Sequence, residues 1–462
     1  MPVCALLLLM LAGSAAVPSA THNQAGVTPL TEGSDWPRFL GPTDDGKSPE
    51  TGILTDWGAS GPPLVWEHVA GEGYAGAVVA EGRLFFFDHH DGRARLVCLD
   101  PETGTEVWRS EHPSVYQDFY GYNRGPRAAP VVDGERVFTF GVEGTLRAHH
   151  VTDGRVLWEV ATADRFGVVQ NFFGAGSSPI VEGDLLIAMV GGSPPGSEGI
   201  HSGQVVGNGT GIVAFDKATG EVRYAVSDEL AGYASPVITT IADRRWGLMF
   251  ARGGLVGFDP TNGAIDFHFP WRARPLQSVN ASNPVVVDDT VFITESYGRG
   301  SALLRVKPGG YEVIRQDGRR NQSLATHYGN VVFHDGILYG SHGRHSGAAE
   351  LRAVDHATGE IRWSEPGLGW TTLLHVDGHL IVLGEDGRLH LVEVTSEAYR
   401  AKASVRPTRA DGTTLLRTPS WSPPVLSHGL LYLRGRDRLI ALELIPGRNF
   451  VGTNNLLSAP SH

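Results

Sequence analysis

Side chains able to recognise a ligand gather in short segments that separate predicted strands. Residues 116–127 and 165–176 supply aromatic, Arg and Asn side chains, residues 321–328 supply His and Tyr, and two Trp residues occupy comparable places farther along. The candidates are Tyr122, Arg124, Arg127, Asn171, Phe172, His327, Tyr328, Trp370 and Trp421. Aromatic rings next to Arg, Asn and His suit a carbohydrate, a quinone or a peptide. The alternative is that these side chains fill the interior of the fold and satisfy the amides of their own loops.

The remaining patterns give weaker signals for catalysis or metal binding. Among the 19 histidines, His342 and His345 lie in a Gly-rich segment and form the best metal-binding pair. Adjacent residues such as His89 and His90 point to opposite faces of a strand, so they do not chelate one ion together. No Ser-His-Asp arrangement and no phosphate-binding loop can be assigned. We therefore predict no catalytic residue and no metal ligand.

The charge balance argues against a nucleic-acid partner. The chain of 462 residues holds 38 Lys and Arg against 50 Asp and Glu, which gives a formal net charge of −12. No run of basic residues stands out, and phosphate binding requires a concentrated positive surface. The excess of acidic residues is expected to serve solubility.

The N-terminus has the pattern of a secretory signal peptide. Residues 5–12 are apolar, too few to span a bilayer, and small residues follow at 13–16. We expect a signal peptide in residues 1–20, cleaved after Ala16 or Ala20, and a secreted or periplasmic protein. Ser14 stands where a lipidated Cys would be needed, so we expect no lipid anchor, and no later segment is apolar enough to cross a membrane. Of the two cysteines, Cys98 lies in an apolar strand and is expected to be a buried hydrophobe.

One short pattern recurs along the chain and predicts a β-hairpin. In residues 96–108, an alternating apolar run leads to Asp100 and Gly104 and ends on Trp108. Copies lie at residues 146–158, 212–224, 255–267 and 351–363. The Asp accepts hydrogen bonds from turn amides, and the Gly can adopt the positive φ that the turn requires. The closing aromatic is expected to pack into the neighbouring unit.

A second hairpin, whose first strand is rich in small residues, precedes each copy; residues 127–138 are typical. The two hairpins together form a four-stranded unit, and the 50-residue interval between Trp108 and Trp158 fits a propeller blade. Eight first hairpins can be counted. Two second hairpins, at 303–314 and 389–399, lack the Asp-x-x-Thr-Gly turn.

The two ends of the repeat complement each other. The last blade lacks an outer strand after residues 438–444, whereas residues 64–69 form an outer strand with no blade before them. We therefore predict an all-β, eight-bladed β-propeller of four-stranded antiparallel blades over residues 64–444, closed by pairing the N-terminal strand with the C-terminal blade. Residues 21–63 would form an N-terminal extension and residues 445–462 a C-terminal tail.

The repeat resembles the tryptophan-docking motif of the pyrroloquinoline-quinone (PQQ) propellers, as in Ala353-x-Asp355-x-x-x-Gly359-x-x-x-Trp363. The opening residues 35–42 look like the start of secreted PQQ-like repeat proteins. The resemblance implies the fold, and it makes PQQ and calcium possible cofactors. The chain departs from the family's dehydrogenases because it has no adjacent Cys pair and lacks their long insertions. A related propeller subunit of the outer-membrane barrel assembly machine is a lipoprotein, which Ser14 counts against here.

The leading hypothesis is a secreted or periplasmic propeller that binds a small molecule, a glycan or a protein without catalysis, as a monomer. One alternative is a quinoprotein oxidoreductase that uses PQQ and calcium on an alcohol or sugar. A second alternative is an interaction subunit of the outer-membrane assembly type. A fold of this kind hosts several functions, so the decision rests on the site.

Overall fold

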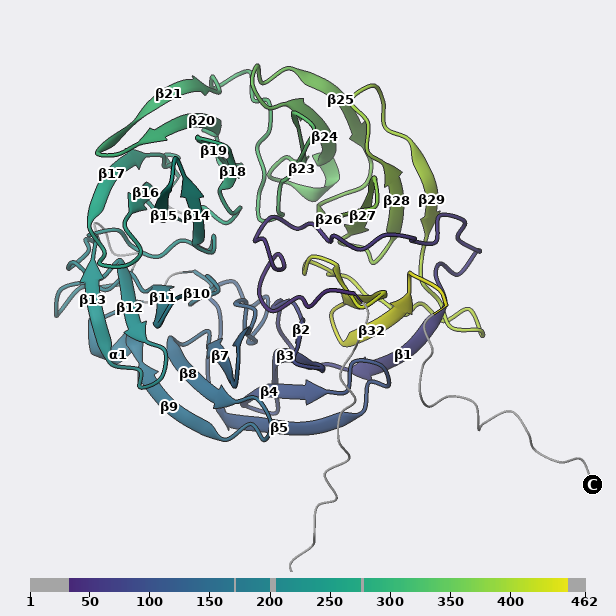
Figure 1. The fold of residues 1–462 in the computed structure, drawn as a ribbon, viewed down its shortest axis with the longest axis horizontal. Helices are drawn as coiled ribbons and strands as arrows, with labels where there is room; N and C mark the ends of the chain where they lie inside the picture. Colours follow the sequence, from purple (N-terminus) through teal and green to yellow (C-terminus); the bar gives the residue numbers. More distant parts are fainter. Residues whose placement is uncertain (1–32, 170–171, 200–204, 276–277, 448–462) are drawn as a thin grey trace, which may run out of the picture.

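The computed structural model describes residues 33–169, 172–199, 205–275 and 278–447. These residues form eight four-stranded antiparallel sheets arranged as blades around a ring (Figure 1). The predicted all-β, eight-bladed propeller is therefore confirmed. The predicted signal peptide, Cys4 and Ser14, and most of the predicted C-terminal tail lie outside the described residues.

The strands of blades 1 to 4 are, in chain order, β2 (Val78–Ala80), β3 (Arg83–His90), β4 (Arg93–Leu99) and β5 (Glu106–Pro113); β6 (Val131–Asp133), β7 (Arg136–Phe140), β8 (Thr145–His150) and β9 (Val156–Ala161); β10 (Ile180–Glu182), β11 (Leu185–Met189), β12 (Ile212–Asp216) and β13 (Val222–Val226); and β14 (Val237–Ile241), β15 (Arg244–Phe250), β16 (Gly254–Phe258) and β17 (Ile265–Pro270). Those of blades 5 to 8 are β18 (Val285–Val287), β19 (Thr290–Glu295), β20 (Gly300–Lys307) and β21 (Gly310–Gln316); β22 (Val332–His334), β23 (Ile337–His342), β24 (Glu350–Asp355) and β25 (Ile361–Pro366); β26 (Thr371–Val376), β27 (His379–Gly384), β28 (Leu389–Glu393) and β29 (Ala401–Val405); and β30 (Val425–Ser427), β31 (Leu430–Arg434), β32 (Arg438–Glu443) and β1 (Leu64–Val69).

Among the described residues, helical structure is limited to two short pieces in loops, α1 (Thr162–Phe166) and the 3-10 turn η1 (Ser346–Ala348). Within the part of the chain that the structure describes, no helix has the length and apolar character needed to cross a membrane.

The recurring turn forms as its residue types require. The Asp100 carboxylate accepts hydrogen bonds from the amides of Glu102 and Thr103 at 3.0 and 2.9 Å, and Gly104 has a φ of 68°. The same arrangement holds at Asp216 and at Asp355. These turns bring the outermost strand of each blade back alongside its neighbour.

The closing aromatic of one blade packs on the turn glycine of the next. Trp108 lies against Gly154 and donates from Nε1 to the Val151 carbonyl at 3.1 Å. Trp158 lies against Gly220 in the same way. The prediction that these aromatics pack into the neighbouring unit is confirmed.

The two degenerate hairpins keep this blade contact by other means. In blade 5, Arg315 replaces the aromatic and donates to the His356 carbonyl of blade 6 at 3.1 Å. In blade 7, the outer strand β29 begins at Ala401, beyond the predicted 389–399 hairpin. Tyr399, which the hairpin was expected to contain, precedes that strand and packs against Trp363 of blade 6, with ring centroids 5.8 Å apart.

The ring closes as predicted, because β1 pairs antiparallel with β32 to complete blade 8. Trp66 of β1 then packs on Gly104 of blade 1 and donates to the Pro101 carbonyl at 2.9 Å. Arg434, which is 3% exposed, donates from β31 to the carbonyls of Ala75 and Phe87. Blade 8 is thus joined to blade 1 by the tryptophan contact and by a buried guanidinium.

Small polar residues just before the inner strands join neighbouring blades. The Ser178 hydroxyl accepts the Ala129 amide at 2.8 Å, the Ser235 hydroxyl accepts the Ser178 amide at 3.0 Å, and Asn283 accepts the Ser235 amide at 2.8 Å. A side chain of one inner strand therefore bonds the backbone of the strand before it. Each of these small polar residues stands directly before the proline that leads into its inner strand, and these hydrogen bonds explain why a small polar residue is found there.

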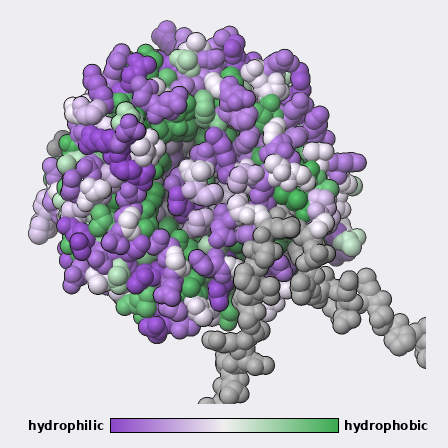
Figure 2. Space-filling model, in the orientation of Figure 1, coloured by the Kyte–Doolittle hydropathy of each residue, from purple (hydrophilic) through white to green (hydrophobic). Residues whose placement is uncertain are grey.

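The ring has two faces of different construction. We call the edge with the tight turns, such as β2–β3 and β4–β5, the turn face. The loop face holds the opposite connections: the segments between blades, such as 114–130, and the β3–β4 type of turn. Antiparallel order places each set at one edge. The view in Figure 2 shows hydrophilic side chains over most of the surface, with hydrophobic ones mainly in the hollows.

Residues 33–63 cross the turn face, as the purple trace in Figure 1 shows. Trp36 exchanges backbone hydrogen bonds with Val79 of blade 1, and Ser48 donates to the His375 carbonyl of blade 7. The Glu50 carboxylate accepts the amides of His428 and Gly429 of blade 8, both at 2.7 Å. This segment therefore covers one face of the ring and leaves the loop face for other contacts.

Candidate functional site

Four predicted residues meet in one place on the loop face. His327, Tyr328, Trp370 and Trp421 come from the segments that lead into blades 6, 7 and 8, and they pack with Tyr74 and Tyr297. We call these six residues the aromatic cluster. All six side chains are half-buried, so each is fixed by its neighbours and still reaches the surface.

The rings of the aromatic cluster form a continuous series. Centroid distances are 4.8 Å for Tyr74–Trp421, 5.3 Å for Trp421–Tyr328 and 5.5 Å for Tyr328–Trp370. His327 then lies 4.9 Å from Trp370 and 5.4 Å from Tyr297. The pairs are tilted or edge-on, which is the arrangement that aromatic quadrupoles favour.

Polar bonds fix the orientation of these rings. Trp370 donates from Nε1 to the Gly343 carbonyl at 3.1 Å, and Trp421 donates to a Glu385 carboxylate oxygen at 3.2 Å. His327 Nδ1 lies 3.2 Å from the Ser296 hydroxyl. The cluster is therefore preformed.

Burial shifts the ionisation of the cluster. It lowers the pKa of His327 to about 4, so the imidazole is neutral at pH 7. Burial also raises the pKa of Tyr328 well above its usual value and that of Tyr297 to about 12. The cluster is thus uncharged near neutral pH and offers mainly apolar surface with a few polar edges.

A second aromatic group lies in the loop between blades 1 and 2. Phe119, Tyr120 and Tyr122 are 59%, 43% and 62% exposed. Tyr120 and Tyr122 lie 5.8 and 6.2 Å from the ring of Phe173. Tyr297 packs with the same hydrophobic group as Phe173, so the two aromatic sets adjoin.

The polar residues of that loop hold its shape. Asp118 accepts the amides of Tyr122 and Asn123 and pairs with Arg127 at 2.9 Å. The Arg127 guanidinium also lies over the rings of Tyr74 and Tyr116. Arg124 is exposed, and its amide donates to Glu72 at 2.8 Å. Arg127 therefore joins this loop to Tyr74 of the aromatic cluster.

The remaining predicted residues occupy different places. Phe172 is 1% exposed, and the guanidinium of Arg252 lies 5.5 Å from its ring centroid. Asn171 lies outside the described residues. His342 accepts the Ala325 amide through Nδ1 at 3.0 Å. Cys98 is a free, fully buried thiol.

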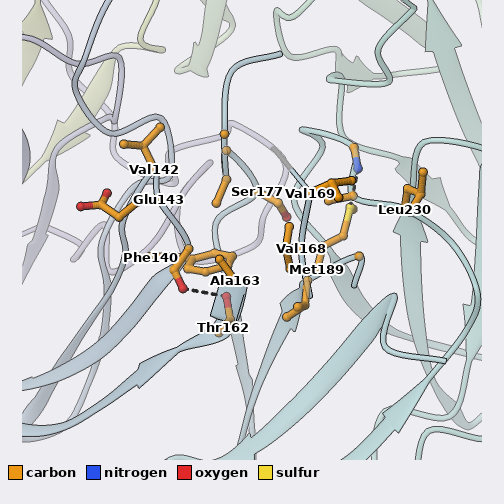
Figure 3. Close-up of a pocket in the computed structure, with 18 of the residues that line it drawn as sticks. Phe140, Val142, Glu143, Thr162, Ala163, Val168, Val169, Ser177, Met189 and Leu230 are labelled. Carbon is orange, nitrogen blue, oxygen red and sulfur yellow. Dashed lines mark hydrogen bonds between the residues drawn. The ribbon is translucent and has the colours of Figure 1, made fainter. Parts of the chain in front are cut away.

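A small cavity opens between blades 2 and 3. Its volume is about 210 Å³, and Figure 3 shows Phe140, Val168 and Met189 among its mainly apolar walls. Thr162, also on the wall, donates to the Gly144 carbonyl at 2.7 Å. The mainly apolar walls of this space suit a small apolar group.

The described residues offer no cluster of carboxylate, imidazole or thiol groups for the calcium of a calcium–quinone group. No group of three or more His, Cys, Asp or Glu side chains in the described ranges could hold a metal ion. The carboxylates nearest the aromatic cluster already bind the protein: Glu295 accepts the amides of Tyr297 and Gly300, and Glu385 accepts Trp421. We therefore derive no step that involves PQQ.

Sequence reasoning missed Tyr74 and Tyr297. Tyr74 lies in the segment between β1 and β2. This segment is a loop between two blades only because β1 completes blade 8. Applying the predicted closure to that segment would have identified it. Tyr297 lies in the β19–β20 turn, and the prediction considered only loops between blades. It reaches the cluster because both kinds of connection end on the loop face.

Known structures share this architecture at low sequence identity. BamB from Moraxella catarrhalis is 14% identical, with a TM-score of 0.55, over 83% of this chain and 98% of that one. Quinohemoprotein alcohol dehydrogenase from Comamonas testosteroni is 13% identical, with a TM-score of 0.61, over 92% and 82%. The computationally designed Ika8 protein is 12% identical, with a TM-score of 0.52, over 83% and 100%. These likenesses concern the fold alone.

A search of curated proteins finds no match. A family model described as outer membrane protein assembly factor BamB matches residues 55–206 and 192–365. The two matched segments overlap and together contain strands β1 to β24. Because they cover more than half of the sequence, the chain belongs to this BamB-type PQQ-repeat propeller family.

Proposed function

We propose that this protein is a non-enzymatic binding propeller that holds a protein partner on its loop face. The aromatic cluster carries the proposal, since six half-buried rings from five connections meet on one surface. Tyr, Trp and Arg are the residues that dominate the energetics of protein interfaces. Exposed Phe119, Tyr120 and Tyr122 extend this surface outward.

The family supports a binding role. Its description names an outer membrane protein assembly factor, and assembly is one form of protein binding. The same description supports a periplasmic or secreted location, in agreement with the apolar residues 5–12. The quinoprotein alternative has no comparable support among the described residues.

Site-specific photo-crosslinking tests the proposal. A benzophenone amino acid replaces Tyr122 in one variant and Ile265 in a matched control; these side chains are 62% and 45% exposed, and Ile265 lies on the outer strand β17. After irradiation in cells of the source organism, we expect a discrete protein adduct at position 122 that disappears when Phe119→Ser is added. Ile265 should give no such adduct.

Two results would contradict this function. One is the same adduct pattern at both positions, or none at position 122. The other is tight binding of PQQ by the calcium-loaded protein together with dye-linked oxidation of an alcohol or sugar, which would establish the quinoprotein alternative.

A further inference from the structure

Six arginines form a positive surface next to the aromatic cluster. They lie in four connections on the loop face, namely β17–β18, β19–β20, β21–β22 and β23–β24. These residues are Arg272, Arg274, Arg299, Arg319, Arg320 and Arg344, and we call them the arginine cluster. All six side chains are exposed, and within the described ranges none lies within 4.0 Å of a carboxylate oxygen.

The four connections are neighbours. Arg299 lies 4.2 Å above the ring of Trp271, which precedes Arg272. The turn that carries Arg299 meets the 317–321 segment, since Asp317 accepts the Ser301 amide at 2.7 Å. Arg344 lies 4.3 Å above the ring of Tyr297. These contacts join the arginine cluster to the aromatic cluster through Tyr297.

This concentration of positive charge is unusual for a chain with a net charge of −12. Many arginines elsewhere on the surface are paired; Arg244, for example, binds both oxygens of Asp266 at 2.7 and 2.5 Å. Near Arg299 and Arg319 the carboxylates bind the backbone or hydroxyl groups instead, whereas Arg272 lines a hollow together with Asp228 and Glu229. Glu295 is 1% exposed and bonds turn amides, and Asp317 binds Ser301 and Ser323. The guanidinium groups of Arg299 and Arg344 therefore keep their hydrogen-bond donors for an external anion.

Two of the guanidinium groups are held in place before any partner arrives. Trp271 is 1% exposed and fixed, so the guanidinium of Arg299 rests on a rigid surface. Tyr297 is held by His327 and supports Arg344 in the same way. Stacking keeps the planar donors of Arg free to make paired hydrogen bonds to a carboxylate.

We propose that the arginine cluster docks an acidic segment of the protein partner while the aromatic cluster receives its hydrophobic side chains. The inference rests on the proposed function. An acidic protein segment fits better than a nucleic acid, because the rings pack tilted against one another and offer edges rather than the open faces on which bases stack. Opposite charges would also steer such a segment to this face.

Binding of poly(Glu,Tyr), an acidic copolymer with aromatic side chains, tests the inference. Fluorescence anisotropy of the labelled copolymer measures its affinity for the full chain at about 50 mM and about 200 mM salt. We compare the wild type, the double variant Arg299→Gln/Arg344→Gln and the control Arg223→Gln/Arg362→Gln. The control removes the same charge from exposed arginines of β13 and β25.

We expect binding that weakens with salt, and a loss of about fivefold in Arg299→Gln/Arg344→Gln. The control should retain wild-type affinity, and poly(Lys,Tyr) should not bind. Equal losses in both variants, or no binding at low salt, would overturn the inference. Binding of polygalacturonate or single-stranded DNA as tight as that of poly(Glu,Tyr) would also overturn it, in favour of another polyanion. A discrete adduct at position 122 alongside any of these failures would leave the proposed function standing.

Discussion

Replacing Arg434 with Met is expected to weaken the closure of the ring specifically. The guanidinium is 3% exposed and donates from blade 8 to the carbonyls of Ala75 at 2.5 Å, Phe87 at 2.9 Å and Gly71 at 3.4 Å. Met retains most of the apolar stem and removes the charged head. The three carbonyls of the first blade would then lose their donor in a site with little access to water.

The magnitude follows from two opposing effects. Hydrogen bonds from a charged donor stabilise by about 1.5–3 kcal/mol each, and a buried carbonyl left without a donor costs about 1–3 kcal/mol. Part of this is offset because burying the guanidinium is itself unfavourable, as shown by the lowering of the pKa of Arg434 to about 10 through burial. We expect a net loss of about 2–4 kcal/mol, which lowers the Tm by about 2–4 °C because the unfolding entropy of a chain of this size is about 1 kcal/mol per kelvin.

Thermal unfolding followed by near-ultraviolet circular dichroism measures the effect. Arg436→Met is the matched control. Arg436 lies two residues away and is exposed, and its hydrogen bond to the Arg417 carbonyl comes from the backbone amide, which the substitution keeps. It removes the same charge and should leave the Tm unchanged. If both variants melt like the wild type, the buried guanidinium does not hold the ring closed and the reasoning fails.

Two further predictions concern the blades. Gly220→Ala should lower the Tm more than Gly183→Ala. Both glycines of blade 3 have positive φ (75° and 56°), but a Cβ at Gly220 would lie 2.7 Å from Trp158, whereas one at Gly183 would meet no atom within 4 Å. Equal losses of Tm would show that the tryptophan contact tolerates the extra methyl group. Stability should also fall as pH drops from about 6.5 to about 4, because burial lowers the pKa of several histidines to about 4, and the unfolded chain then binds more protons than the folded one. These histidines are His149, His327, His342, His375 and His390. Thermal unfolding across this pH window checks the effect, and a constant Tm would refute it.

The fold was predictable because its determinants are local. Asp100 and Gly104 specify a turn through their own hydrogen bonds and φ, and the turn repeats in recognisable form. The unpaired strand at residues 64–69 specified the closure, since an open ring edge would be left otherwise. Outer strand β29 was placed too early because blade 7 lacks the turn that marks the boundary elsewhere.

The site was predictable only in part because it forms from distant segments. Trp370 and Trp421 could be identified from their positions before predicted blades. Arg272, Arg299 and Arg344 could not, because each stands alone in the sequence among ordinary loop residues. Their charges come together only when the connections of blades 5 and 6 meet on one face. The net charge of −12 for the whole chain gives no indication of this local excess of positive charge.

The separation of the two faces explains how one ring can combine stability with binding. On the turn face, the N-terminal segment bonds blade turns directly: Gly52 donates to Asp377 at 2.8 Å, and Glu50 accepts two amides of blade 8. On the loop face, the aromatic cluster and the arginine cluster are held by buried contacts yet keep exposed edges and charges. Changes to surface residues of the loop face, such as Arg299 or Arg344, should therefore alter binding with little effect on the Tm, whereas changes at Arg434 should do the reverse.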